Sequence, residues 1–360
     1  MKKNIILLPF LLIIVACNQQ ESKSKSSTDN KAILKEITEY KKIDFSEKSL
    51  IKFMDSVKKL STDSLVKKAS FYSDSLFLAI KQINRKLDKL ELDILKTAIR
   101  QKSINFDQAQ KIFGKIELDS IYLGKKIIPV KFYAFSNGGK NDKEFAISFN
   151  EEQVRGTTNL YFFDADSLLA KKAIYNYYGL ELNHYKDADG KTIIYYREDY
   201  ITGSGIWWNN LYFYKYYNNR IIPILNELSN GNTTGALGAR VKWLESIKLK
   251  TNPLVLKMVY YHGFNEWKHE NDWSLNYLLN DSTVVKYNWD ENSKTLKGAY
   301  ENSKITKNQI LTYYVQDNEL LYINVYYNLL KDKMRDKQKL KFILDYLNTV
   351  KNDELDRNSK

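Results

Sequence analysis

The stretch WWNNLYFYKYYNNRIIPIL, residues 207–225, decides the fold class of this chain. Its two halves, 207–217 and 220–225, are rich in aromatic and β-branched side chains, which favour strands. Asn218-Asn219 between them is a turn signal. Two runs joined so tightly form a hairpin, so the stretch predicts antiparallel pairing.

Similar short runs extend on both sides of this hairpin. Candidate strands cover residues 127–135, 145–149, 159–163, 192–197, 239–249, 254–262, 274–279, 283–289, 310–315 and 320–327. Turn signals separate many of them, namely Asn137-Gly138-Gly139, Asp189-Gly190, Asn230-Gly231 and Asp317-Asn318. We therefore predict a mainly antiparallel, Tyr-rich β domain over residues 114–328, built as a sandwich or an open barrel-like sheet. No repeat of fixed period supports a propeller.

The preceding region, 31–113, is predicted to be helical. It contains neither glycine nor proline, whereas all 14 glycines lie between positions 114 and 298. Asp44 and Glu47 resemble a capping box before a first helix. A second, longer helix is expected from Ser61 or Thr62, with an apolar stripe at Leu65, Ala69, Tyr72, Leu76, Ile80, Ile83, Leu87, Leu90, Ile94 and Ala98. The stripe permits either a coiled coil or an intramolecular helical hairpin or bundle.

The chain ends in a predicted amphipathic helix within 329–360. Leu340, Ile343, Leu344 and Leu347 share one helical face, and the last ten residues are polar and expected to fray. The predicted fold class is therefore α+β, with an N-terminal helical segment, a mainly antiparallel β domain and a C-terminal helix.

The first seventeen residues carry a different kind of signal. Lys2 and Lys3 precede an apolar run that is too short to span a bilayer as a stable helix, which is typical of a signal peptide. The run ends in Ile14-Val15-Ala16-Cys17, which resembles the lipobox of bacterial lipoproteins. In general texture the chain resembles uncharacterised outer-membrane lipoproteins of Gram-negative bacteria.

This resemblance implies cleavage of a signal peptide, 1–16, and lipidation of Cys17, which would anchor the protein in a lipid bilayer. Asn18 stands where aspartate usually retains such proteins at the inner membrane, which favours the outer membrane. Residues 17–30 then form the lipidated cysteine and a flexible polar tether. Cys17 is the only cysteine, so its lipidation leaves no thiol for a disulfide, a metal site or a nucleophile.

The charge distribution points toward lipid rather than nucleic acid. Residues 31–113 contain 18 Lys and Arg against 11 Asp and Glu. In a cell envelope the anionic lipid head groups are the nearer polyanion, so we expect no nucleic-acid partner. A solvated basic helix face explains the same excess without any partner.

The aromatic residues suggest a ligand surface. All six tryptophans lie between positions 207 and 289, and 25 of the 27 tyrosines follow Gly114. Rings on one face of a sheet can stack on sugars, and the best candidates are Trp207, Trp208, Tyr212, Tyr214 and Tyr216. The competing interpretation is that these aromatics are core residues of strands.

No catalytic or metal motif is complete. Residues 202–205 (Thr-Gly-Ser-Gly) fit neither a nucleophile elbow nor a phosphate loop, and 187–190 (Asp-Ala-Asp-Gly) lack the rest of a calcium loop. His262 and His269, with Glu266 and Glu270, do not have the spacing of a helical zinc motif. We expect no metal and no cofactor.

These observations predict a non-enzymatic, membrane-anchored envelope lipoprotein that acts as a binding module for a carbohydrate or protein ligand. The alternatives are an envelope hydrolase with an unrecognised active site and an immunity-type protective lipoprotein.

Overall fold

The computed structural model describes residues 42–67, 78–116, 124–135, 143–149, 156–176, 179–201, 207–232, 240–269, 272–313 and 319–359. Asp44–Lys360 form one compact unit. The predicted signal peptide, Cys17, the tether and the 202–205 motif lie outside the described residues.

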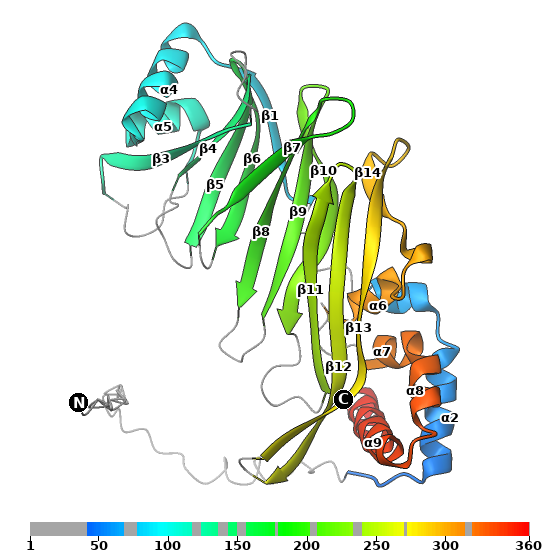
Figure 1. Cartoon of the computed structure of the whole chain (residues 1–360). Coiled ribbons are helices and arrows are strands. Elements are labelled where there is room, and N and C mark those ends of the chain that lie inside the picture. The colour runs from blue at the N-terminus through cyan, green and yellow to red at the C-terminus, as the bar shows by residue number, and fades with distance from the viewer. Residues whose placement is uncertain are drawn as a thin grey trace, which may run out of the picture. The chain divides into compact units, whose positions relative to one another are not determined.

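The larger sheet has eight strands, and each strand pairs antiparallel with its neighbours (Figure 1). Their order is β14 (Thr295–Gly298), β13 (Asp272–Asp290), β12 (Leu254–His269), β11 (Arg240–Thr251), β10 (Arg220–Asn232), β9 (Trp207–Tyr217), β8 (Thr192–Ile201), β7 (Leu182–Lys186). Strands that are consecutive in sequence are adjacent in space, so the sheet is a meander. The predicted hairpin is confirmed: β9 and β10 are joined by Asn218 and Asn219, whose φ angles of 48° and 58° fit the tight turn that such hairpins favour.

The smaller sheet has six antiparallel strands. Their order is β1 (Lys81–Lys86), β6 (Ser167–Asn176), β5 (Gly156–Asp164), β4 (Glu144–Phe149), β3 (Ile127–Ala134), β2 (Ser103–Asn105). The helices are α2 (Glu47–Lys58), α4 (Lys89–Gln101), α5 (Phe106–Phe113), the 3₁₀ helix η2 (Tyr300–Asn302), α6 (Lys307–Leu311), α7 (Glu319–Val325), α8 (Tyr327–Lys333) and α9 (Lys337–Ser359).

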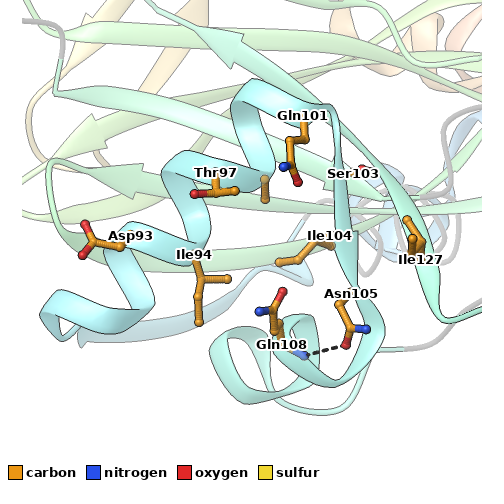
Figure 2. Close-up of a pocket in the computed structure, with 10 residues that line it drawn as sticks. Asp93, Ile94, Thr97, Gln101, Ser103, Ile104, Asn105, Gln108 and Ile127 are labelled. Atoms are coloured by element: carbon orange, nitrogen blue, oxygen red, sulfur yellow. Dashed lines mark hydrogen bonds between the residues drawn. The ribbon is translucent and has the colours of Figure 1, made fainter.

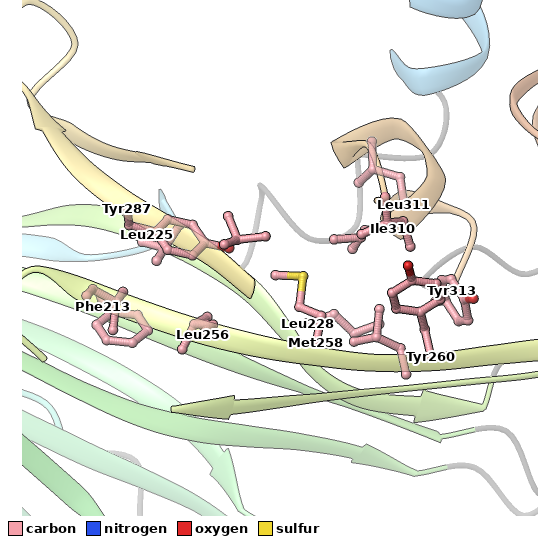
Figure 3. Packing of buried hydrophobic residues seen from close by; sticks show 14 of the residues in the cluster. Phe213, Leu225, Leu228, Leu256, Met258, Tyr260, Tyr287, Ile310, Leu311 and Tyr313 are labelled. Carbon is pink, nitrogen blue, oxygen red and sulfur yellow. The ribbon is translucent and has the colours of Figure 1, made fainter. Parts of the chain in front are cut away.

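The buried hydrophobic residues gather in three regions. Helices α4 and α5 pack on the smaller sheet through residues such as Leu95, Ile112 and Phe163. Helices α2 and α6–α9 pack on one face of β11–β13 (Figure 1), and Figure 3 shows Met258 and Tyr260 of β12 near Ile310 and Leu311 of α6. A third cluster joins strands of the two sheets.

The α+β fold class and the C-terminal helix are confirmed. Helix α9 buries Ile343 and Leu347, as predicted, but it continues to Ser359, so the expectation of a frayed tail was wrong. No helix in the described part of the chain has the length and apolar character needed to cross a membrane.

The predicted long helix with the stripe from Leu65 to Ala98 was wrong. Strand β1 interrupts it and pairs with β6, and Asn84 within β1 has a φ of 52°, which no right-handed helix contains. A new helix, α4, then begins at a capping box formed by Asp88 and Glu91. Ile83 and Leu87 are four residues apart, as on a helical face, only by chance. A strand followed by a helix can reproduce a few apolar steps of three or four residues. The first predicted helix is confirmed as α2, although Ser46 caps it rather than Asp44.

Three further expectations were wrong. The predicted strands at 310–315 and 320–327 overlap helices α6 and α7. Helix α7 buries four consecutive residues, Leu321 to Asn324, so its apolar run has no helical period to recognise. Asn230-Gly231 lies inside β10 instead of in a turn, where Asn230 pairs with Asn209 and Gly231 with Trp208 of β9; a Cβ added at Gly231 would lie only 3.1 Å from the Trp208 Cβ. The predicted strands at 274–279 and 283–289 are parts of one strand, β13.

Candidate functional site

The predicted aromatic platform on β9 is not a surface. Tyr212, Tyr214 and Tyr216 are buried in the cluster that joins the two sheets, beside Leu160 and Phe162 of β5. The Tyr216 hydroxyl group contacts the backbone carbonyls of Phe145 and Phe163, each at 3.1 Å, which links β9 to β4 and β5. The prediction failed because the smaller sheet covers this face.

Trp207 and Trp208, the other two predicted site residues, are half-buried. Trp208 packs against the core beneath the helices and over Gly231. Neither ring contributes to a platform with the three buried tyrosines.

A charged pair accompanies these tyrosines. The buried Lys172 of β6 has its ammonium group 5.9 Å from the centre of the Tyr212 ring, and Oε1 of Glu198 on β8 accepts a hydrogen bond from the Tyr175 backbone N–H at 3.1 Å. Burial raises the pKa of Glu198 to about 7, although the Lys172 charge opposes that shift. Burial lowers the pKa of Lys172.

The other predicted polar motifs have structural positions. Asp187 is in the turn between β7 and β8, where its Oδ1 accepts hydrogen bonds from the backbone N–H groups of Asp189 and Lys191 at 3.0 and 2.8 Å. The Asp189-Gly190 turn is thereby confirmed. His262 is buried, with Nδ1 3.3 Å from the Tyr313 hydroxyl, and burial lowers its pKa. Among the residues that the structure describes, no group of three or more His, Cys, Asp or Glu side chains could hold a metal ion.

A shallow pocket of about 390 Å³ lies between α4, β2 and α5 (Figure 2). Its walls include Thr97, Gln101 and Ile127, with Asp93 as its titratable side chain. Asn105 already caps α5, because its Oδ1 accepts the backbone N–H of Asp107 at 2.9 Å and that of Gln108 at 3.4 Å. The pocket thus offers no pair of groups for acid–base chemistry.

The strongest candidate surface is the sheet face opposite the helices. Leu244, Tyr260 and Tyr287 point from β11, β12 and β13 into the helix-covered core. Because side chains alternate along a strand, their neighbours point the other way. We call this side the open face and define it by Trp243, Glu245, Ile247, Lys257, Val259, Tyr261, Tyr277, Ser282 and Val284.

Three aromatic rings form one end of the open face. Trp243 lies opposite Tyr261 in the register, and their ring centres are 5.5 Å apart with planes 28° from parallel. Tyr277 meets the Tyr261 ring edge to face at 5.4 Å and is 45% exposed. Burial is the main cause of the raised pKa of Tyr261, followed by the neighbouring Tyr277. The three rings therefore form a continuous row across three strands.

Aliphatic residues continue this row toward the other end of the open face. Ile247, Lys257 and Val284 lie side by side in the register of β11, β12 and β13, and Ile247 and Val284 are 39% and 50% exposed. From Trp243 to Ile247 the face extends about 13 Å along the strand, and three strands add about 10 Å across it. Lys257 and Glu245 are the charged side chains within this set, and the exposed Asn280 and Lys286 of β13 lie on the same side, opposite Tyr261 and Val255.

No protein-family model matches the chain, and comparisons with curated proteins and with solved structures find no match.

Proposed function

We propose that this protein is a lipid-anchored cell-envelope protein that acts as a binding module, and that a protein partner docks on its open face. The observation that carries the proposal is the row of contacting rings formed by Trp243, Tyr261 and Tyr277. Exposed aliphatic residues lie next to this row on the same face. Exposed apolar surface of this kind marks interaction sites, and Trp and Tyr are the residues that most often dominate binding energy.

The aliphatic half of the open face favours a protein over a carbohydrate. Sugar sites combine aromatic rings with polar groups that bind hydroxyls, whereas Ile247 and Val284 offer neither. The face is also smaller than the roughly 800 Å² that a stable interface buries on each partner. It therefore fits the apolar centre of an interface, with residues around it as the rim.

Site-specific photo-crosslinking in the full-length, membrane-bound protein tests this proposal. A photoreactive residue at position 284 should give a crosslink to one discrete protein, and Trp243→Ala should abolish that crosslink. The control position is Leu355, which is exposed and apolar but belongs to α9, one of the helices on the opposite, covered side of the sheet. Equal crosslinking from positions 284 and 355, or no effect of Trp243→Ala, would contradict the proposal.

The anchor is tested separately. Cys17→Ala removes the acceptor of the lipid chains that the lipobox resemblance implies. We expect the variant to leave the outer-membrane fraction and to appear among soluble envelope proteins. Membrane association at the wild-type level would contradict lipid anchoring through Cys17 without affecting the docking proposal.

An envelope hydrolase is the second candidate, and one observation favours it. The pKa of Glu198, raised by burial to about 7, lies in the range that suits a general base. However, Glu198 Oε2 is buried and has no hydrogen-bond partner among the residues that the structure describes. Hydrolysis of an envelope polymer that disappears in Glu198→Gln, with a pH profile centred near 7, would support this function.

A further inference from the structure

A groove of about 590 Å³ lies beside strand β8, away from the open face. Strand β7 pairs with β8 only from Thr192 to Tyr196, so Arg197 to Ile201 extend beyond the end of β7 and pair with β9. The groove occupies this position, and its walls include Lys131, Glu181, Asn183, Arg197, Asp199 and Leu211.

Asp199 is the most informative of these residues. It is only 4% exposed, and its Oδ1 is 2.9 Å from Nε of Arg197. With its amide nitrogen turned toward β8, Asn209 donates a second hydrogen bond to the same oxygen at 3.0 Å. Among the described residues both of these donors reach Oδ1, and Oδ2 is not one of the fully buried oxygens that lack a partner, so it is the oxygen of Asp199 that can accept a donor from the groove. A nearly buried carboxylate is thus held in place with one acceptor left for a hydrogen-bond donor.

The charges of the groove select among possible donors. Lys131 and Arg197 balance Glu181 and Asp199, so neither an anion such as phosphate nor a cation gains a net attraction. The Asn183 amide group donates to Oε1 of Glu181 at 3.2 Å, which leaves its own carbonyl as a further acceptor. Leu180 and Leu211 supply apolar wall. Fixed acceptors, a guanidinium donor and apolar patches suit a neutral ligand with several hydroxyl groups.

We propose that this groove is a carbohydrate subsite in which Asp199 and Arg197 bind adjacent hydroxyl groups of a neutral sugar. The proposal goes beyond protein docking on the open face and does not depend on it. The volume of the groove lies within the range of sites for small ligands, so the groove fits one or two sugar units rather than a long chain.

Titration of the full-length protein in detergent with cellobiose, maltose and N,N′-diacetylchitobiose tests the proposal. At least one of these neutral disaccharides should bind saturably and shift the backbone amide NMR signals of Leu211 and Ser229, two residues of the groove wall. Asp199→Ala and Arg197→Ala should each weaken binding about 10-fold or more, because each removes a hydrogen bond to a charged group.

The matched control is Asp189→Ala, which removes an exposed carboxylate from the turn of the same β7–β8 hairpin. It should leave disaccharide binding unchanged. The proposal is overturned if no disaccharide shifts the Leu211 and Ser229 signals in the wild-type protein. It is also overturned if inorganic phosphate binds there more tightly than the sugars, or if folded Asp199→Ala protein binds them as well as the wild type does.

Discussion

Tyr216 and Tyr277 belong to the same sheet, yet they have opposite surroundings. Tyr216 is 4% exposed and makes two contacts with backbone carbonyls of the smaller sheet, whereas Tyr277 is 45% exposed and meets the Tyr261 ring of the open face. Strand β9 is the more aromatic of the two, with seven aromatic residues among its eleven, whereas β13 has four among nineteen. Whether a tyrosine stabilises the fold or is available to a partner therefore depends on whether another layer of the structure, here the smaller sheet, covers it. The residue type alone does not decide this.

The largest effect should come from the covered side of the large sheet. Arg240 of β11 is buried and makes a bidentate ion pair with Glu319 of α7, at 3.0 and 2.7 Å. Burial alone would raise the pKa of Glu319, but the Arg240 charge overcomes it and the pKa is lowered. Glu319→Ala leaves a buried, unpaired guanidinium group, so we expect a loss of about 3–5 kcal/mol in unfolding free energy.

Chemical denaturation of Glu319→Ala beside the wild type measures this loss. Glu245→Ala on the open face is the control, because it removes a half-buried carboxylate from the other side of the same sheet. A change below about 0.5 kcal/mol is expected for that control. Equal losses in both variants would show that the two faces do not differ as described.

The two tyrosines give the next test. Tyr216→Phe deprives two carbonyl groups of the Tyr216 hydroxyl and should cost about 1–3 kcal/mol, because unsatisfied buried polar groups are expensive. Tyr277→Phe removes an exposed hydroxyl and should change stability by less than about 0.5 kcal/mol. Thermal unfolding of both variants would sharpen the comparison, and a reversed order would break it.

A third test concerns the pH dependence of stability at the boundary between the sheets. Folding raises the pKa of Glu198 from 4.5 to about 7, so the folded state binds its proton more tightly than the unfolded state does. The contribution of Glu198 to stability is therefore full below pH 4.5 and falls as the pH rises toward 7, by at most on the order of 3 kcal/mol. Glu198→Gln should remove this decline.

The measurement is the difference in unfolding free energy between wild type and Glu198→Gln from pH 4.5 to 8. The difference is needed because buried His262, with its lowered pKa, acts in the opposite direction in both proteins. The contribution of His262 to the free energy of unfolding falls as the pH drops below 6.5, because the unfolded chain then binds a proton that the folded state does not. A difference that does not change with pH would show that Glu198 titrates normally.

The sequence predicted the fold class and the central hairpin, because strand composition and two adjacent asparagines are local signals. It also predicted α2 and α9 from their apolar spacing. It could not separate β1 from a helix, because a strand–helix junction at Leu87 and Asp88 reproduced the helical steps. The capping box at Asp88 and Glu91 was visible in the sequence and marks where the helix begins.

The candidate surface was harder to predict. Counting outward from the β11–β12 turn, where Thr251 pairs with Leu254, places Trp243 opposite His262. A bulge between Lys248 and Lys250 shifts the register by one residue, so that Trp243 meets Tyr261 instead. No local sequence pattern predicts this one-residue change of register. The aromatic residues of β9 were more conspicuous, but the smaller sheet that covers them comes from a distant part of the chain.

The contacts between helices α2 and α9 constrain the order in which the chain can fold. The Phe45 backbone N–H, next to α2, donates to Asn348 of α9 at 3.0 Å, and Lys351 contacts Ser49 at 2.6 Å. Leu50 and Met54 share a core with Ile343 and Leu347. During synthesis α2 leaves the ribosome early, but its core partners are made last. A chain truncated before α9 therefore uncovers the part of the α2 apolar face that Ile343 and Leu347 cover, so an interrupted molecule carries an exposed apolar patch that the finished one buries.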